Sequence, residues 1–261
     1  MEVLSALPDL TNLSLPTIAL VTAIFARISA LVMLLPGLGE SSIPVRPRLA
    51  VAMAVALILT PMVISTATPP ITLSGAAMMI VAEVISGALI GFSIRIAIFT
   101  LQTAGSIASQ SLSLAQLFGS NIDAELASPI STLLMFVGIV LAVSTGLHFE
   151  TVRVLVISFE IMPLGIFPGA SDTGQWAAER AAFSFAAALS LALPFVVLGF
   201  IYNLAIGAAN RAMPQLMVAF VGVPAVTLAG MVLLALTAPI LLDVWLDILN
   251  DIVSTLLGEL S

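Results

Sequence analysis

Long apolar runs, separated by short polar or proline-containing breaks, fill most of this chain. An α-helix of about 20 apolar residues is long enough to cross the hydrocarbon core of a bilayer. On this spacing we predict helices over residues 16–35, 49–63, 73–100, 129–147, 181–209 and 215–242. The pattern predicts an all-α, multi-helix membrane-associated protein with long helices, of which the last two form a C-terminal hairpin.

An amphipathic segment, residues 243–252, continues the last apolar run. Asp243, Asp247 and Asp251 recur every fourth residue, so they share one face of a helix. Like charges at this spacing repel one another, and water or a partner must solvate them. A solvated face is the interpretation that we favour.

The composition agrees with a membrane protein and excludes other classes. Hydrophobic residues make up 61% of the chain and charged residues only 8%, whereas soluble domains are about a quarter charged. The chain has no cysteine and one histidine, His148, which excludes a disulfide framework, a cysteine nucleophile and a histidine cluster for a metal. A net charge of −7 without any lysine argues against nucleic acid as a partner.

Three ionisable residues stand inside the predicted helices: Arg27, Glu83 and Arg95. An arginine at the centre of a lipid-facing helix costs about 2.5–3.5 kcal/mol. Arg27 therefore snorkels or pairs with one acid, or its helix packs against other protein along much of its length. Gly87 and Gly91 have the small-xxx-small spacing that lets helix backbones approach closely, which favours a buried helix. Because no internal partner is evident, we expect partners for these charges on other chains.

A polar corner interrupts the apolar passage between residues 181 and 242. Its residues are Asn210, Arg211, Pro214 and Gln215, followed by Gly222 and Pro224. Pro194 and Pro224 lie inside the two predicted helices, where a proline removes a hydrogen bond and kinks the helix. The corner is a turn, a partner surface or a pathway. Its side chains offer more hydrogen-bonding capacity than a bare turn uses, which favours a contact between subunits.

Residues 103–121 are small and hydroxyl-rich, and we predict that this segment is not helical. Large apolar side chains protrude from this background at Leu112, Leu114, Leu117 and Phe118. Non-helical backbone at membrane depth requires surrounding protein or a water-filled cavity. The segment is either an ordinary loop with buried anchors or a plug in a pore. The stretch 149–180 is more polar. Glu150 and Arg153 could pair on the surface of a helix there, and residues 162–165 and 168–172 are predicted to mark a long connection.

Motifs of catalysis or cofactor binding are absent: the sequence has no phosphate-binding glycine loop with lysine, no HExxH and no nucleophile elbow. We therefore predict that the protein is not an enzyme and uses no cofactor or metal. Two classes remain, a secondary transporter for small solutes and a structural subunit of a larger conduit. Transporters often carry paired half-repeats with interrupted helices, whereas the two halves of this chain differ in polarity and loop length. The conduit subunit is favoured.

Three passages carry a resemblance to a known family. The corner contributes Asn210-Arg211, Pro214-Gln215, Val218, Phe220, Gly222 and Pro224. The other two are Ile43–Ala50 with Pro61, and Gly146–His148 followed by Ser158-Phe159 and Met162–Gly165. In this order and spacing the passages resemble the FliR/SctT family of type III secretion export gate proteins.

The resemblance implies a subunit of a hetero-oligomeric flagellar export gate in the bacterial inner membrane, within the flagellar basal body. It implies FliP and FliQ as partners, FlhB and FlhA as further partners, membrane lipid, and unfolded exported proteins as substrates. It also implies a FliP-like part, residues 1–180, and a FliQ-like helical hairpin, residues 181–261. An injectisome gate subunit of the SctT type is the alternative that the sequence leaves open.

The family's plug loop matches residues 105–121, which implies that the apolar residues of this segment seal the pore. Many members read Gly-x-x-x-Gly-x-Gln-Met-Gly there. This chain has Ser109 in place of the second glycine and Leu112-Ser113 in place of the Met-Gly pair.

Overall fold

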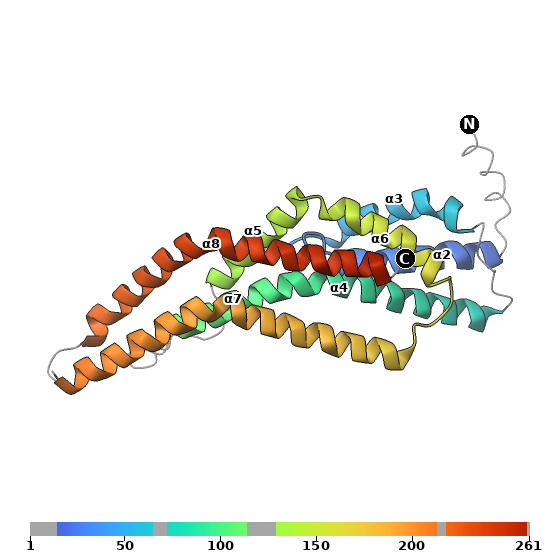
Figure 1. The fold of residues 1–261 in the computed structure, drawn as a ribbon. Coiled ribbons are helices and arrows are strands. Elements are labelled where there is room, and N and C mark those ends of the chain that lie inside the picture. Colours follow the sequence, from blue (N-terminus) through green and yellow to red (C-terminus); the bar gives the residue numbers. More distant parts are fainter. Residues whose placement is uncertain (1–14, 65–71, 114–128, 213–217, 260–261) are drawn as a thin grey trace. The chain divides into compact units, whose positions relative to one another are not determined.

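The computed structural model describes residues 15–64, 72–113, 129–212 and 218–259, and every regular element in these ranges is an α-helix (Figure 1). In chain order the helices are α2 (Leu15–Leu34), α3 (Val45–Ile64), α4 (Leu73–Ser113), α5 (Pro129–Ser144), α6 (Leu147–Ile161), α7 (Ala170–Ala212) and α8 (Val218–Glu259). Five helices are long and apolar enough to cross a membrane, and α5 with α6 adds a sixth span if that bent pair is one broken span. The predicted all-α membrane class with long helices is confirmed.

Helix α4 extends through Ser113, whereas we predicted that it ends at residue 100. Its hydroxyl groups are satisfied inside the helix, because Thr100, Ser106 and Ser111 each donate to the carbonyl four residues earlier, at 2.7–3.0 Å. Small hydroxyl residues therefore continue this helix. The predicted non-helical segment is wrong for residues 103–113, and residues 114–128 lie outside the described ranges.

Helix α6 occupies the first part of the more polar stretch 149–180, for which the apolar pattern predicts no membrane-length helix. Its buried residues recur with the period of a helix: Leu147, Thr151, Val154, Leu155 and Ser158. Gly146, with a φ of +94°, separates α6 from α5 in a conformation that favours glycine. The helix predicted over residues 129–147 therefore ends at Ser144, and α6 is a further helix that the apolar pattern does not predict. The apolar pattern misses α6 because charged residues on its outer face interrupt the apolar run.

Helices α7 and α8 are longer than the apolar runs that predicted them. Helix α7 begins at Ala170 instead of residue 181, and α8 continues through the amphipathic segment to Glu259. Pro194 lies inside α7, and Pro224 lies inside α8. Membrane helices tolerate such prolines where neighbouring groups satisfy the freed backbone.

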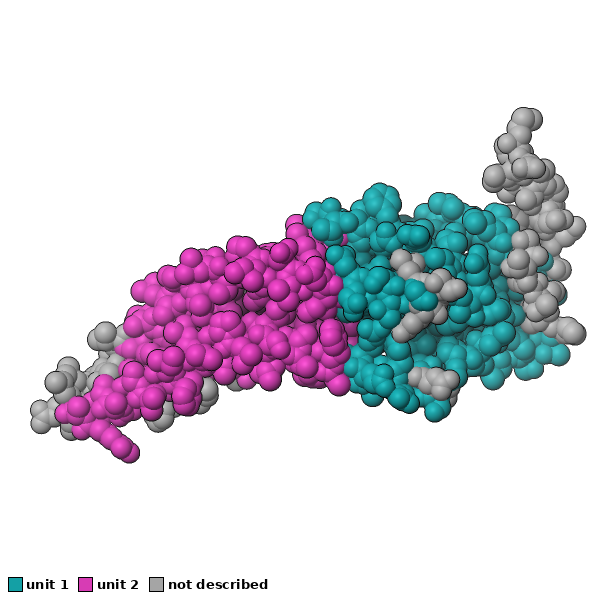
Figure 2. Space-filling view, in the orientation of Figure 1, with its two compact units in different colours: residues 1–95, 143–180, 250–261 teal, residues 96–142, 181–249 magenta. Residues whose placement is uncertain are grey.

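The described residues group into two compact units (Figure 2). Unit 1 contains residues 1–95, 143–180 and 250–261, and unit 2 contains residues 96–142 and 181–249. Helices α4, α5, α7 and α8 contribute residues to both units. The predicted division into residues 1–180 and 181–261 is a division along the chain, whereas the two units are defined by contacts between segments. The units therefore do not test this division, which stays a prediction.

In unit 2, hydrogen bonds tie three helices to α4. Trp245 of α8 is fully buried and donates from Nε1 to the carbonyl of Ala97 at 2.8 Å. Thr100 shares a hydrogen bond of 2.7 Å with Ser184 of α7. Ser131 of α5 donates to a backbone carbonyl of α4 at 2.8 Å. Because apolar surface gives helices little reason to associate within lipid, such polar contacts and close packing hold the unit together.

Candidate functional site

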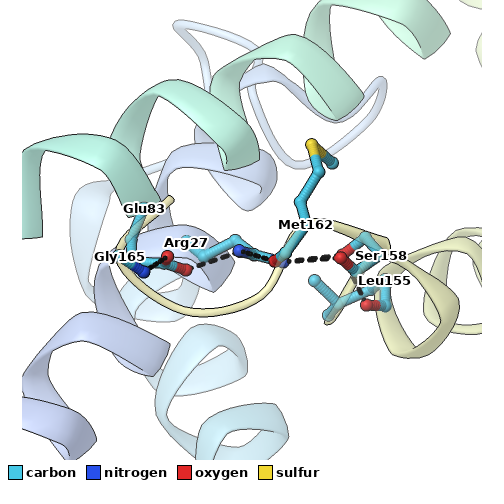
Figure 3. A network of polar contacts seen from close by, with 6 residues as sticks. All are labelled: Arg27, Glu83, Leu155, Ser158, Met162 and Gly165. Atoms are coloured by element: carbon cyan, nitrogen blue, oxygen red, sulfur yellow. Dashed lines mark hydrogen bonds and ion pairs between the residues drawn. The ribbon is translucent and has the colours of Figure 1, made fainter. Parts of the chain in front are cut away.

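Arg27 of α2 is fully buried in unit 1 and binds two other segments of the chain (Figure 3). Its Nε donates to Glu83 Oε2 of α4 at 2.6 Å, forming a buried ion pair. Its Nη1 donates to the carbonyl and the hydroxyl of Ser158, and its Nη2 donates to the carbonyl of Met162, at 2.7–3.2 Å. The guanidinium also lies over the Phe159 ring, 4.2 Å from the ring centroid. Arg27 thus joins α2, α4 and the end of α6.

The connection between α6 and α7 closes over the same ion pair (Figure 3). The N–H of Gly165 donates to Glu83 Oε1 at 3.0 Å, so both carboxylate oxygens of Glu83 are engaged. Gly165 has a φ of +81°, and a Cβ there would crowd the side chain of Met79. Leu164 packs against the apolar cluster that contains Leu20 and Met79. Contacts with α2 and α4 therefore fix the path of this connection.

The position of Arg27 at the end of α6 has an electrostatic reason. The last carbonyls of a helix lack partners within the helix and carry partial negative charge. The Ser158 carbonyl already accepts from the Met162 N–H, and Arg27 adds a second donor there and a donor to the carbonyl of Met162. Glu83 neutralises the charge of Arg27. Buried charge and non-helical backbone both require such partners in apolar surroundings. Of the alternatives for Arg27, pairing with an acid of the same chain is the one observed.

Two glycines bring α4 into backbone contact with α2. A Cβ on Gly87 would overlap the carbonyl oxygen of Arg27, and a Cβ on Gly91 would lie 3.1 Å from the carbonyl oxygen of Leu31. Gly87 lies one turn after Glu83, so the close approach of the helices lets the ion pair be short. The glycines of the small-xxx-small pattern thus allow close contact between α4 and α2 of the same chain.

A second charged network shapes the connection between α2 and α3. Arg95 of α4 binds both carboxylate oxygens of Glu40, at 2.7 and 3.3 Å. Arg48 of α3 donates to the carbonyls of Glu40 and Ile43. A bidentate arginine–carboxylate pair holds a defined geometry. Glu40 therefore links this connection to α4 by its side chain and to α3 by its backbone.

The ion pairs of Arg27, Glu83 and Arg95 correct the expectation that these charges find partners on other chains, since each has its partner on this chain. The sequence analysis missed these partners because they are distant: Arg27 is 56 residues from Glu83, and Arg95 is 55 residues from Glu40. One signal was available. The passage Met162–Gly165 is one of those that carry the family resemblance, and in the structure it contacts the Arg27–Glu83 pair.

The structure describes all of the predicted corner except Pro214 and Gln215, which lie outside its ranges. Asn210 and Arg211 are in the last turn of α7, Pro224 is in the early part of α8, and all three are exposed. Exposed polar groups are accessible to a partner. The role of the corner as a contact between subunits stays a prediction.

Gly222, the remaining corner residue, has a packing role within unit 2. It is buried in α8, and a Cβ there would overlap the hydroxyl of Tyr202 on α7. The two helices of the hairpin therefore approach closely at this point. A glycine is needed here for contact within the chain, whatever the partners of the exposed corner residues are.

The predicted plug is described only in part. Leu112 lies in the last turn of α4 and is buried, and a Cβ on Gly230 of α8 would overlap its side chain. Gly199 of α7 approaches the backbone of Ser111 in the same turn. The other predicted plug residues lie outside the described ranges: Leu114, Leu117 and Phe118. Leu112 packs within unit 2, and its role in sealing a pore stays a prediction.

Together, these features define a class: a helical membrane protein in which a buried and a partly buried ion pair are formed within the chain. In the part that the structure describes, no three acidic or histidine residues lie together as a metal site. The model of the family described as bacterial export proteins, family 1, matches residues 18–252. The chain belongs to this family.

Relatives with similar sequences are flagellar proteins. The chain is 36% identical over 226 residues to the flagellar biosynthetic protein FliR of Caulobacter vibrioides, covering 86% of this chain and 90% of the relative. It is 27% identical over 238 residues to the protein of that name from Escherichia coli, covering 90% of each. The Pectobacterium carotovorum protein of that name is 26% identical over 218 residues, covering 83% of each. The similarity therefore extends over most of the chain.

Proposed function

We propose that this protein is a structural subunit of the flagellar type III protein export gate. With FliP and FliQ it forms the pore through which unfolded flagellar proteins cross the inner membrane. The observation that carries the proposal is the 36% identity to a flagellar biosynthetic protein FliR over 86% of the chain. On this proposal the protein acts without catalysis or a cofactor, lies in the flagellar basal body, and has FlhB and FlhA as further partners.

Exposed apolar side chains support a subunit that other helices or lipid surround. Phe200 and Leu204 of α7, and Leu236 and Ile240 of α8, are each 67–70% exposed. Large apolar surface of this kind marks contact with protein or membrane. The C-terminal hairpin therefore has surface available for partner subunits.

Co-expression with FliP- and FliQ-like proteins tests the proposal. The affinity-tagged chain, solubilised in mild detergent, should elute from size-exclusion chromatography in one complex with both proteins. A monodisperse chain that binds neither protein would contradict the proposal. The flagellar system is favoured over an injectisome because the relatives described above are flagellar proteins. If the chain binds injectisome subunits in preference to flagellar ones, it is an injectisome gate subunit instead.

Replacing Arg211 with alanine is expected to lower the yield of the three-protein complex about tenfold, because a charged contact at the centre of an interface is worth about 1–2 kcal/mol or more. The amount of the chain in membranes should stay unchanged, since Arg211 is exposed. Arg46→Ala is the matched control, because Arg46 is an exposed arginine in unit 1. An equal effect of the two substitutions would indicate that the corner is a plain turn and not a contact between subunits.

The plug is a further part of the proposal. Replacing Leu117 and Phe118 with glycine in the assembled gate is expected to raise ion conductance across planar bilayers, because apolar side chains would no longer exclude hydrated ions from the path. Leu112→Ala is the contrasting variant. It is expected to lower the amount of the chain instead, since Leu112 packs against Gly230. If the conductance of the double glycine variant stays at background, the proposal that these residues form a plug is wrong.

A further inference from the structure

We propose that the Arg27–Glu83 ion pair selects the register of α2 against α4, a choice that the glycine contacts between these helices leave open. The proposal concerns unit 1 alone and does not depend on the export function. Gly87 faces the backbone of Arg27, and Gly91 faces the backbone of Leu31. From the first contact to the second, the residue number increases by four in each helix, so the two helices run parallel.

The glycine contacts repeat after one turn. Gly87 and Gly91 are four residues apart and lie on the same face of α4, as Arg27 and Leu31 do on α2. If α2 moved by one turn, Ala23 would face Gly87 and Arg27 would face Gly91. Each glycine would again meet a helix backbone, and Ala23 is the smaller residue. Steric fit at the glycines is thus satisfied in either register.

Apolar contacts discriminate weakly between the two registers. The buried residues of α2 around Arg27 are aliphatic, as at Ala23, Ile24, Ile28 and Leu31. In a membrane, lipid tails are as apolar as these side chains, so there is no hydrophobic gain from one alignment over another. Register must then come from detailed packing and from polar contacts.

The ion pair distinguishes the registers sharply. Arg27 Nε and Glu83 Oε2 are 2.6 Å apart in the observed register. A shift of one helical turn, about 5.4 Å, would move these two atoms beyond hydrogen-bonding distance. The bonds from Arg27 to Ser158 and Met162 would break in the same step. Because both charged side chains are 0% exposed, the shifted state would hold two unpaired buried charges. Such a loss disfavours it by about a hundredfold or more.

Selection of a register differs from a contribution to stability. Replacing both members of a buried ion pair with apolar residues is often neutral or stabilising, whereas setting register is a well-attested use of buried polar groups. The variant Arg27→Leu/Glu83→Leu should therefore stay folded and accumulate. Its α2 should no longer occupy a single position along α4.

Two disulfide reporters test the proposal in the full-length chain, which has no cysteine of its own. A Cβ on Gly91 would lie 2.8 Å from Leu34 Cβ, so Leu34→Cys with Gly91→Cys reports the observed register after a small adjustment. Ala30→Cys with Gly91→Cys reports a shift of one turn, because position 30 would then take the place of position 34. Gly91→Cys is common to both reporters, so their ratio compares the two registers on the same background.

The reporters are oxidised in membranes, and the crosslinked peptides are quantified by mass spectrometry. With the native pair, the first reporter should crosslink at least about tenfold more than the second. In Arg27→Leu/Glu83→Leu the ratio should fall to within about threefold, with the amount of chain in the membrane unchanged. An unchanged ratio would overturn the proposal.

A second replacement keeps the test decisive if the leucine variant does not accumulate. Arg27→Met/Glu83→Gln also removes both charges, and its glutamine retains an acceptor for the Gly165 N–H. This variant should show the same fall in the crosslink ratio. If neither variant accumulates, the pair is required for folding itself and the proposal is overturned.

Discussion

Replacing Glu83 with leucine is expected to lower the free energy of unfolding by about 3–5 kcal/mol, because Arg27 would remain buried without its counter-charge. Both side chains are fully buried, and Glu83 accepts from Arg27 at 2.6 Å and from the Gly165 N–H at 3.0 Å. The substitution removes both bonds at once. The measurement is the temperature at which half of the detergent-solubilised chain aggregates, together with the amount of chain in the membrane.

Glu160→Leu is the control for this prediction, because Glu160 is an exposed acid in unit 1. An exposed site of this kind usually changes stability by less than about 0.5 kcal/mol. Adding Arg27→Leu to Glu83→Leu should restore most of the loss, since no unpaired charge would remain. Equal aggregation temperatures for Glu83→Leu and Glu160→Leu would show that the buried network does not stabilise the chain.

Replacing Gly87 with alanine is expected to destabilise the protein by about 1–3 kcal/mol, since the new methyl group would overlap the carbonyl oxygen of Arg27. That oxygen belongs to the backbone of α2, so relief requires a shift of the helix. The shift would also lengthen the bond from Arg27 to Glu83. The same aggregation measurement detects the loss.

Gly207→Ala provides the matched control in α7, because a Cβ on Gly207 would meet nothing within 4 Å. Alanine favours the helix interior by about 1 kcal/mol over glycine, so this variant should be as stable as the parent or more stable. A Gly87→Ala chain as stable as Gly207→Ala would mean that α2 and α4 do not meet as closely as the structure has them.

Arg27 shows how far the sequence can be interpreted. An arginine within a membrane-length apolar helix indicates a charge that must be satisfied, and this needs no knowledge of the fold. The group that satisfies it is not evident, because Glu83 is 56 residues away in the chain. The other acceptors include backbone carbonyls at the end of α6. Every residue has such a carbonyl, so the sequence does not indicate which of them bind Arg27.

The boundaries of α4 and α6 show a second limit. Hydroxyl residues favour loops in general, yet those of α4 bond to their own helix and continue it to Ser113. Charged residues interrupt the apolar run in α6, so the apolar pattern predicts no helix there, although its buried positions follow a helical period. In both helices the outcome depended on where the side chains point, which residue type alone does not show.

The sequence by itself determined the class of protein, because a bilayer admits backbone only where its polar groups are bonded, and long apolar runs meet that demand as helices. It also carried the resemblance that the family match confirmed. Only the tertiary structure decided that the buried charges pair within the chain and that Gly87 brings Arg27 to Glu83. The reason is physical. The need for a partner follows from a residue's immediate apolar surroundings, whereas the partner itself depends on distances between segments far apart in the chain.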